Sequence, residues 1–456
     1  MLTPKVIIDG FEAGILADST IQATNGFAGG AGIDIFFEPG ILKVSPALTA
    51  MTEAASPNNI TDKINWILKY GTEYFALGAI GRIYKYVSSA WTLQHTDATS
   101  GSAGEGFVVF NGNIHWMGDT NMGKFDGTTW TDGFKTGFTS AEWHPMIIFG
   151  DKLYVGNERY VASLDTSDAL TLQALDLPQG WIIKCLAVYG NRLMIGASNA
   201  GSYLECGLFS WDGTSSSFEE IWTLKENSID AMVNWQNLLI VFAGQKGKIY
   251  AFNGASLNQL PIVIPNLLEF NTYVICPGAV TECAGNLIFG FGVADFTYTG
   301  IYQLANKPNT PLTLPYIPSS GLSTHEIRSL LFTGNNQFLA GWYDGTNSGI
   351  DMVSTTARIA TTAYWESQIY EIAIGDNPIP IKGVELIARP MPTNTSVTVK
   401  YKKDNPTSWS TLGTINSTNQ DKVLLGITGL CKTIQIRLEF TCSANNSPKI
   451  QTIRIY

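Results

Sequence analysis

Apolar and polar positions alternate along this chain in a pattern that repeats seven times. Each copy has an apolar run, a tight polar turn containing Gly or Asn, and a second apolar run. The seven copies cover residues 67–77, 108–116, 147–155, 186–195, 232–241, 280–289 and 330–339. Their turns are marked by Gly71, Gly112, Gly150, Gly190, Gln236, Gly285 and Gly334, which are 41, 38, 40, 46, 49 and 49 residues apart. A period in this range, with hairpin turns in every repeat, is typical of a β-propeller.

A further strand-like run follows each hairpin. These runs are 82–86, 123–125, 161–164, 206–211, 248–252, 300–304 and 349–353. Several lead into turns such as Asp126-Gly127 and Asn253-Gly254, where Gly, and to a lesser degree Asn and Asp, tolerate a positive φ. Each repeat therefore predicts three or four antiparallel strands, and seven such blades around one axis bury a core that a single blade cannot. We expect the N-terminal arm or residues 364–372 to complete the last blade.

The repeats divide the chain into three parts. Residues 1–60 form an N-terminal arm, part of which is expected to close the ring and remove its open edge. Residues 61–377 form the predicted propeller, which ends where Pro378 and Pro380 interrupt the pattern. Strand candidates in residues 378–456 are 381–388, 396–401, 410–415, 422–427, 433–440 and 450–455. Their alternation indicates one buried and one solvent-facing side, so the sequence predicts an all-β chain, a seven-bladed β-propeller with a C-terminal β-sandwich.

Composition supports this fold class. Only 14% of the 456 residues are charged, below the ~25% of typical soluble domains. No stretch shows helical periodicity, and no apolar run nears the ~20 residues that span a bilayer. The N-terminus lacks a basic segment followed by a long apolar core, so we expect synthesis and assembly in a cytoplasm. Cys431 and Cys442 flank one extended strand, ~35 Å apart and too far for a disulfide, whereas the other four could pair, although reduced, buried thiols are the better interpretation.

Candidate chemistry is sparse. Sialidase-type propellers repeat a Ser-x-Asp-x-Gly-x-x-Trp turn, which residues 126–130 and 210–213 only approximate because Gly follows Asp directly. The four histidines lie in different repeats without the spacing of metal ligands, and turn-forming Asp and solvated Glu account for the acids. We therefore predict no enzymatic activity, no catalytic residue, no cofactor and no metal site. Trp409 is the best candidate for an exposed aromatic that stacks on a sugar, although packing at a strand edge is the simpler interpretation.

Charge separates the parts of the chain. Residues 378–456 carry ten basic and four acidic residues, a net charge of +6, whereas the rest carries 18 and 34, a net charge of −16. Either the two parts solve solubility differently, or the basic part binds an anionic partner such as the acidic propeller of an identical subunit. A basic β-sandwich could also bind an anionic glycan or nucleic acid. Lys400, Lys402 and Lys403 cluster where a predicted strand ends, and we predict them as subunit-interface residues, with a solvated strand end as the alternative.

The arm ends in Glu38-Pro39-Gly40-Ile41-Leu42-Lys43-Val44, a propeller follows, and the C-terminal part closes with residues 435–439 and 453–455. In this order and length, the chain resembles the tail nozzle or hub proteins of tailed bacteriophages. The resemblance implies a structural virion protein that forms a hexameric ring with copies of itself and contacts tail adaptor or tube proteins and tail fibres or spikes. DNA would pass without tight binding, and no active site follows. The alternative is a carbohydrate- or receptor-binding, lectin-like propeller of a tail tip or of secreted origin.

Overall fold

The fold is all-β. The computed structural model describes residues 3–16, 25–99, 104–202, 204–244, 247–262, 264, 275–291, 300–307, 310–321, 325–373, 377–404, 406–416 and 421–456. In these ranges every regular element is a strand, from β1 to β44, and most strands belong to antiparallel four-stranded sheets. No helix long and apolar enough to span a membrane is found in the described part of the chain.

Seven four-stranded sheets follow one another and are called here sheets 1 to 7. Sheet 1 contains β8 (Ile64–Tyr70), β9 (Glu73–Gly78), β10 (Arg82–Val87) and β11 (Ala90–Thr96). Sheet 2 contains β12 (Gly106–Phe110), β13 (Asn113–Met117), β14 (Asn121–Phe125) and β15 (Trp130–Thr136). Sheet 3 contains β16 (Met146–Phe149), β17 (Lys152–Asn157), β18 (Tyr160–Leu164) and β19 (Leu170–Asp176). Sheet 4 contains β20 (Trp181–Tyr189), β21 (Arg192–Asn199), β22 (Cys206–Trp211) and β23 (Glu220–Leu224).

The other three sheets have the same meander, with one exception in the origin of the last strand. Sheet 5 contains β24 (Ile229–Trp235), β25 (Leu238–Ala243), β26 (Lys248–Phe252) and β27 (Leu257–Gln259). Sheet 6 contains β28 (Val280–Cys283), β29 (Asn286–Gly290), β30 (Ile301–Leu304) and β31 (Leu312–Tyr316). Sheet 7 contains β32 (Glu326–Gly334), β33 (Gln337–Tyr343), β34 (Ser348–Arg358) and β7 (Pro46–Ala50). The outer strand of sheet 7 therefore comes from the N-terminal arm, not from residues 364–372.

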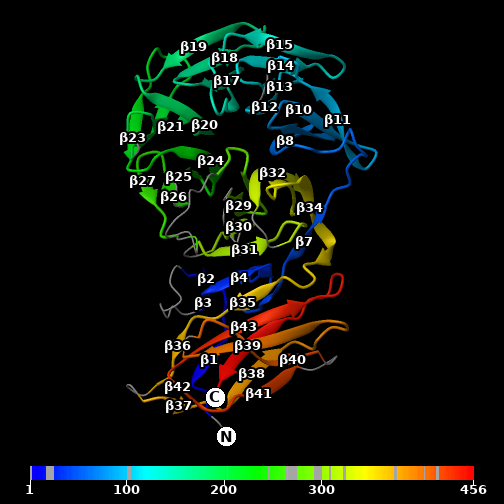
Figure 1. Cartoon of the computed structure of the whole chain (residues 1–456). Coiled ribbons are helices and arrows are strands. Elements are labelled where there is room, and N and C mark those ends of the chain that lie inside the picture. Colours follow the sequence, from blue (N-terminus) through cyan, green and yellow to red (C-terminus); the bar gives the residue numbers. More distant parts are fainter. Residues whose placement is uncertain are drawn as a thin grey trace.

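The sheets are arranged in a closed ring, a propeller-like fold. The first strand of each sheet contacts the first strand of the next, and β32 of sheet 7 returns to β8 of sheet 1 (Figure 1). The last residue of several first strands donates a hydrogen bond to the turn of the following sheet. Tyr70 Oη donates to Gly112 O at 2.8 Å, and Trp235 Nε1 donates to Gly285 O at 2.9 Å. Gly112 itself has a φ of 74°, which explains why Gly recurs at these turns.

Two further sheets, one of four strands and one of six, are together called the C-terminal module. The module takes strands from both ends of the chain. Its four-stranded sheet has the order β1 (Val6–Ile8), β44 (Ile450–Ile455), β38 (Gly383–Ala388) and β41 (Lys422–Gly426). Its six-stranded sheet has the order β4 (Gly29–Ala31), β35 (Tyr364–Glu366), β43 (Thr433–Thr441), β39 (Ser396–Lys403) and β40 (Ser410–Ile415), and β36 (Tyr370–Glu371) also pairs with β43. Both sheets contribute side chains to one apolar cluster, including Val384, Ile453, Val399 and Leu438.

The arm joins the ring to the module. Its strand β1 lies in the four-stranded module sheet, β4 lies in the six-stranded module sheet, and β7 lies in sheet 7. The strand pairing therefore crosses the boundaries predicted near residues 60 and 377. Three short pairs complete the described strands: β2 (Gly14–Ile15) with β3 (Gly26–Phe27), β5 (Ile33–Asp34) with β6 (Lys43–Val44), and β37 (Ile379–Pro380) with β42 (Leu430–Cys431). The Gly32 N–H donates to Leu314 O at 2.8 Å and so covers the edge of β31. All six cysteines are buried and free.

Candidate interaction surfaces

The three predicted interface lysines lie on β39, where side chains alternate between the two faces of the six-stranded sheet. Val397 and Val399 are fully buried in the module core, whereas Lys400 and Lys402 lie on the opposite, outward side. Strand β39 pairs with β43 so that Lys400 is opposite Arg437. Lys403 is opposite the buried Ile434 and lies on the other face of the sheet from Lys400 and Lys402. The three lysines therefore do not form one patch.

Lys400 belongs to an ion-pair network within the chain. Its Nζ is 2.7 Å from a carboxylate oxygen of Glu439, and Glu439 is 3.0 Å from Nε of Arg437. Arg437 also pairs with Glu366 at 2.8 Å. Burial raises the pKa of Glu366, and Arg437 opposes this rise. Much of the charge of Lys400 is thus compensated inside the module, which leaves less for a partner than the sequence suggested.

Trp409 is half-buried and lies beneath cations. Lys402 Nζ is 4.7 Å from the centroid of the Trp409 ring, and the Arg437 guanidinium carbon is 5.9 Å from it. A cation over an indole face is a favourable contact of about 0.5–1 kcal/mol at an exposed site. A sugar stacking on that face would have to displace Lys402. Asn405, four positions before Trp409 in the sequence, lies outside the described residues.

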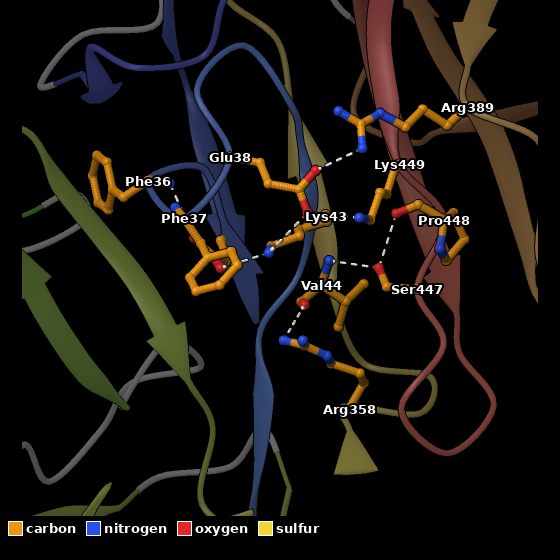
Figure 2. Close-up of polar contacts among 11 residues, drawn as sticks. Phe36, Phe37, Glu38, Lys43, Val44, Arg358, Arg389, Ser447, Pro448 and Lys449 are labelled. Carbon is orange, nitrogen blue, oxygen red and sulfur yellow. Dashed lines mark hydrogen bonds and ion pairs between the residues drawn. The ribbon is translucent and has the colours of Figure 1, made fainter. Parts of the chain in front are cut away.

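A second polar cluster joins the arm to both the ring and the module (Figure 2). It is built on the turn between β5 and β6, where Asp34 Oδ1 accepts hydrogen bonds from the N–H groups of Phe36 and Phe37, each at 3.0 Å. The turn folds Lys43 back, so that its side chain is only 4% exposed. Lys43 Nζ lies 3.5 Å from Asp34, 3.6 Å from Glu38 and 3.9 Å from the centroid of the Phe37 ring. Burial lowers the pKa of Lys43, and the two carboxylates oppose this.

Glu38 is the centre of this junction. It pairs with Lys449 at 2.6 Å and with Arg389 at 3.0 Å, both from the C-terminal part of the chain. The hydrogen bond from Lys449 is the main reason that the pKa of Glu38 lies below its ordinary value. Beside it, the Val44 N–H donates to Ser447 Oγ at 2.9 Å.

Arg358 links the same segment to the ring. It extends from β34 of sheet 7, and its Nη1 donates to Val44 O at 3.2 Å (Figure 2). Residues 37–44 therefore contact sheet 7 and the module at once. Sequence reasoning placed residues 38–44 in the arm and used them to support a family resemblance, and it missed this role. The available signal was a set of three charged residues, Asp34, Glu38 and Lys43, within an otherwise apolar hairpin.

The ring contains buried acids, which are scattered singly. Glu105 lies beside His144, with 3.4 Å between Oε2 and Nε2, and burial raises the pKa of Glu105 to about 9, assisted by the charges of Asp119 and Glu142. Burial also raises the pKa of Asp230 to about 6. Within the described ranges, no group of three or more His, Cys, Asp and Glu side chains is arranged to hold a metal ion.

A small apolar cavity lies among the described residues of the module. It has a volume of about 10 Å³, roughly the space of one water molecule. Leu386, Met391, Val397 and Ile450 are among its lining residues. A cavity of this size does not accommodate a sugar or a nucleotide.

Comparison with known proteins supports the fold. No protein-family model matches the chain, and a search of curated protein sequences gave no match. Two solved structures of the extracellular domain of one B. thetaiotaomicron protein are similar; it is described as a one component system in the first (13% identity, TM-score 0.51) and as a hybrid two component system in the second (14%, 0.50). Each alignment covers 76% of this chain, and 44% and 43% of those chains, so this chain spans less than half of their length.

A third similar structure is Raptor from Chaetomium thermophilum. The alignment has 9% identity and a TM-score of 0.47, and it covers 69% of this chain and 30% of Raptor. At these identities the likeness concerns the fold alone.

Proposed function

We propose that the chain is a structural, non-enzymatic component of a bacteriophage tail, in which copies form a ring that extends the DNA channel and anchors fibres or spikes. In this proposal the seven sheets are the seven blades of one propeller, and the two module sheets form a β-sandwich. The observation that carries the proposal is the arm, which supplies a strand to sheet 7 and a strand to each module sheet. This strand pairing ties the ring of sheets and the module together into one subunit, and a ring of copies requires subunits of fixed shape.

Side chains that meet inside the ring of sheets limit where DNA could pass. The rings of Trp66 and Trp143 have their centroids 6.3 Å apart, and the guanidinium of Arg328 lies 5.8 Å from the Trp143 ring. These side chains come from sheet 1, from the segment before sheet 3 and from sheet 7, so they meet across the ring. The proposal therefore assigns the DNA channel to the space between copies. A net charge of −10 per chain offers few of the cationic contacts that hold phosphates.

The rival function is binding of a carbohydrate or a receptor. It would use Trp409 as a stacking surface, yet Lys402 already lies over that ring. The solved structures that resemble the chain include extracellular domains, but they share only its fold. We therefore keep this function as the alternative outcome of the test below.

The test removes the chain from assembling virions. If the chain builds the tail, virions made without it should be tailless or should lose their DNA, as seen by electron microscopy and by nuclease sensitivity of the genome. Trp409→Ala virions serve as the matched control and should adsorb normally. Intact, normally shaped virions that only fail to adsorb, together with an adsorption defect of Trp409→Ala, would instead establish the receptor-binding function.

A further inference from the structure

The outward side of the four-stranded module sheet carries an ordered mixture of apolar and charged side chains. Strand register places Ile7, Arg454, Glu385 and Leu424 side by side across all four strands. Neighbouring positions such as Val384, Ile453 and Ile455 are fully buried on the other side. Ile7 and Leu424 are nevertheless 51% and 50% exposed. We call Ile7, Glu385, Lys422, Leu424 and Arg454 the module outer face.

The polar centre of the module outer face is already organised. Glu385 is buried and pairs with Lys422 at 3.1 Å and with Arg454 at 3.2 Å, and it accepts a hydrogen bond from Tyr456 Oη at 2.9 Å. One carboxylate thus holds two cations in fixed positions. Lys5 and Lys382 are exposed at the adjoining strand ends, and Asp9 and Asp421 are exposed at the opposite ends of β1 and β41. The four cations outnumber the three carboxylates, and two exposed aliphatic side chains flank them, a mixture that protein interfaces bury.

The acidic surface that complements this face lies at the other end of the molecule. Residues 104–224, which contain sheets 2, 3 and 4, carry 14 acidic and six basic residues, a formal net charge of −8. This is half of the negative charge that precedes residue 378. One of these acids, Glu105, is buried with its pKa raised to about 9, so it adds no charge to the surface at neutral pH. Sheets 2 and 3 lie on the side of the ring away from the module and sheet 4 follows at the flank of the ring, whereas β38 and β41 of the module are at the opposite end of the molecule (Figure 1). The two surfaces therefore cannot meet within one chain.

We propose that the module outer face docks on sheets 2 to 4 of a second copy of this chain. The contact joins two different surfaces head to tail, and contacts of this type generate closed rings or, if they do not close, filaments. Opposite charges at the interface favour this orientation over head-to-head pairing. Burial of Ile7 and Leu424 supplies the part of the affinity that salt does not screen. This inference rests on the proposed ring and names the surfaces that build it.

The experiment measures self-association of the full-length chain by sedimentation velocity over a range of concentrations, at low and at high salt. The wild type should associate, and association should weaken at high salt. The double variant Ile7→Glu, Leu424→Glu should weaken association by at least about tenfold, because two acids then face an acidic partner. Phe332→Glu on sheet 7, an exposed apolar residue outside both surfaces, is the matched control and should associate normally. Unchanged thermal unfolding would show that both variants fold.

Carbodiimide cross-linking of mixed light and heavy isotope-labelled protein locates the contact independently. Lys5, Lys382 and Lys422 of one copy should link to carboxylates in residues 104–224 of the other. Links confined to other surfaces, or a wild type that stays monomeric at every concentration, would overturn this inference. In both cases the proposed tail function would be decided separately, by whether virions made without the chain are tailless or lose their DNA.

Discussion

Replacement of Glu38 by Gln tests the junction between ring and module. The change keeps the size of the side chain and removes one negative charge from a site where Glu38 meets Lys43, Arg389 and Lys449. Lys43, only 4% exposed, would keep Asp34 at 3.5 Å as its single carboxylate partner. Removing one partner of a fully buried pair costs about 3–5 kcal/mol. Because the Glu38 side chain is 23% exposed, solvent reduces this cost, and we expect about 2 kcal/mol.

The reciprocal change, Lys43→Met, should cost less. It removes the desolvated cation itself, whereas Glu38 keeps Lys449 and Arg389, and Asp34 keeps its two backbone N–H donors. An apolar side chain of similar length then fills the site, so we expect a loss below about 1 kcal/mol. The double variant should be about as stable as Lys43→Met alone, since no buried cation is left without its partner. The coupling energy is therefore expected to equal the cost of Glu38→Gln, about 2 kcal/mol.

Urea unfolding, followed by tryptophan fluorescence, measures these differences. The pKa of Glu38 is held below its ordinary value of 4.5, so its contribution is present above that pH and is lost as the pH falls through the folded-state pKa. The cost of Glu38→Gln should accordingly be seen at neutral pH and should shrink in acid. Additive costs for the two single variants, or a Glu38→Gln cost that is no larger than that of Lys43→Met, would refute the reasoning.

Three further outcomes are expected. Glu105 lies beside His144, and burial together with the charges of Asp119 and Glu142 raises its pKa to about 9; the folded protein therefore holds an extra proton and loses stability as the pH rises from about 4.5 to 9. Glu105→Gln should flatten the dependence of Tm on pH, and an unchanged slope would contradict this. Leu48→Ala in β7, a buried position, should cost about 2–5 kcal/mol in urea unfolding, and a negligible cost would show that β7 does not close sheet 7. Duplex DNA should not bind the isolated chain at physiological salt, and a salt-sensitive gel shift would favour a DNA-holding role.

The hairpins could be predicted from the sequence because their signal is local. The predicted pair 67–77 about Gly71 corresponds to β8 and β9, and the pair 280–289 corresponds to β28 and β29. An apolar run on each side of a Gly turn contains both the strands and their register. The six strands expected after residue 378 also recur within one or two residues of their structural bounds.

The partners of the arm could not be predicted in the same way. Strand β1 has three residues and pairs with β44, near the other end of the chain, and β4 has three residues and pairs with β35. Strands this short show no alternation, and spacing along the chain does not encode which distant edge they join. The lysines on β39 show the related difficulty for a site. Proximity in sequence suggested one patch, whereas alternation across the strand and a pairing with Glu439 divided them.

The arm also makes the ring and the module depend on one another. Sheet 7 lacks its outer strand until β7 pairs with β34, and the four-stranded module sheet lacks an edge strand until β1 pairs with β44. Both contacts join the first fifty residues to segments near or beyond residue 350, so their chain-closure cost is met only when the whole chain is present. An unpaired strand edge is a template for pairing with another chain. A subunit that has completed both pairings can therefore meet its neighbours through side chains on its finished faces, which is the kind of contact proposed for the module outer face.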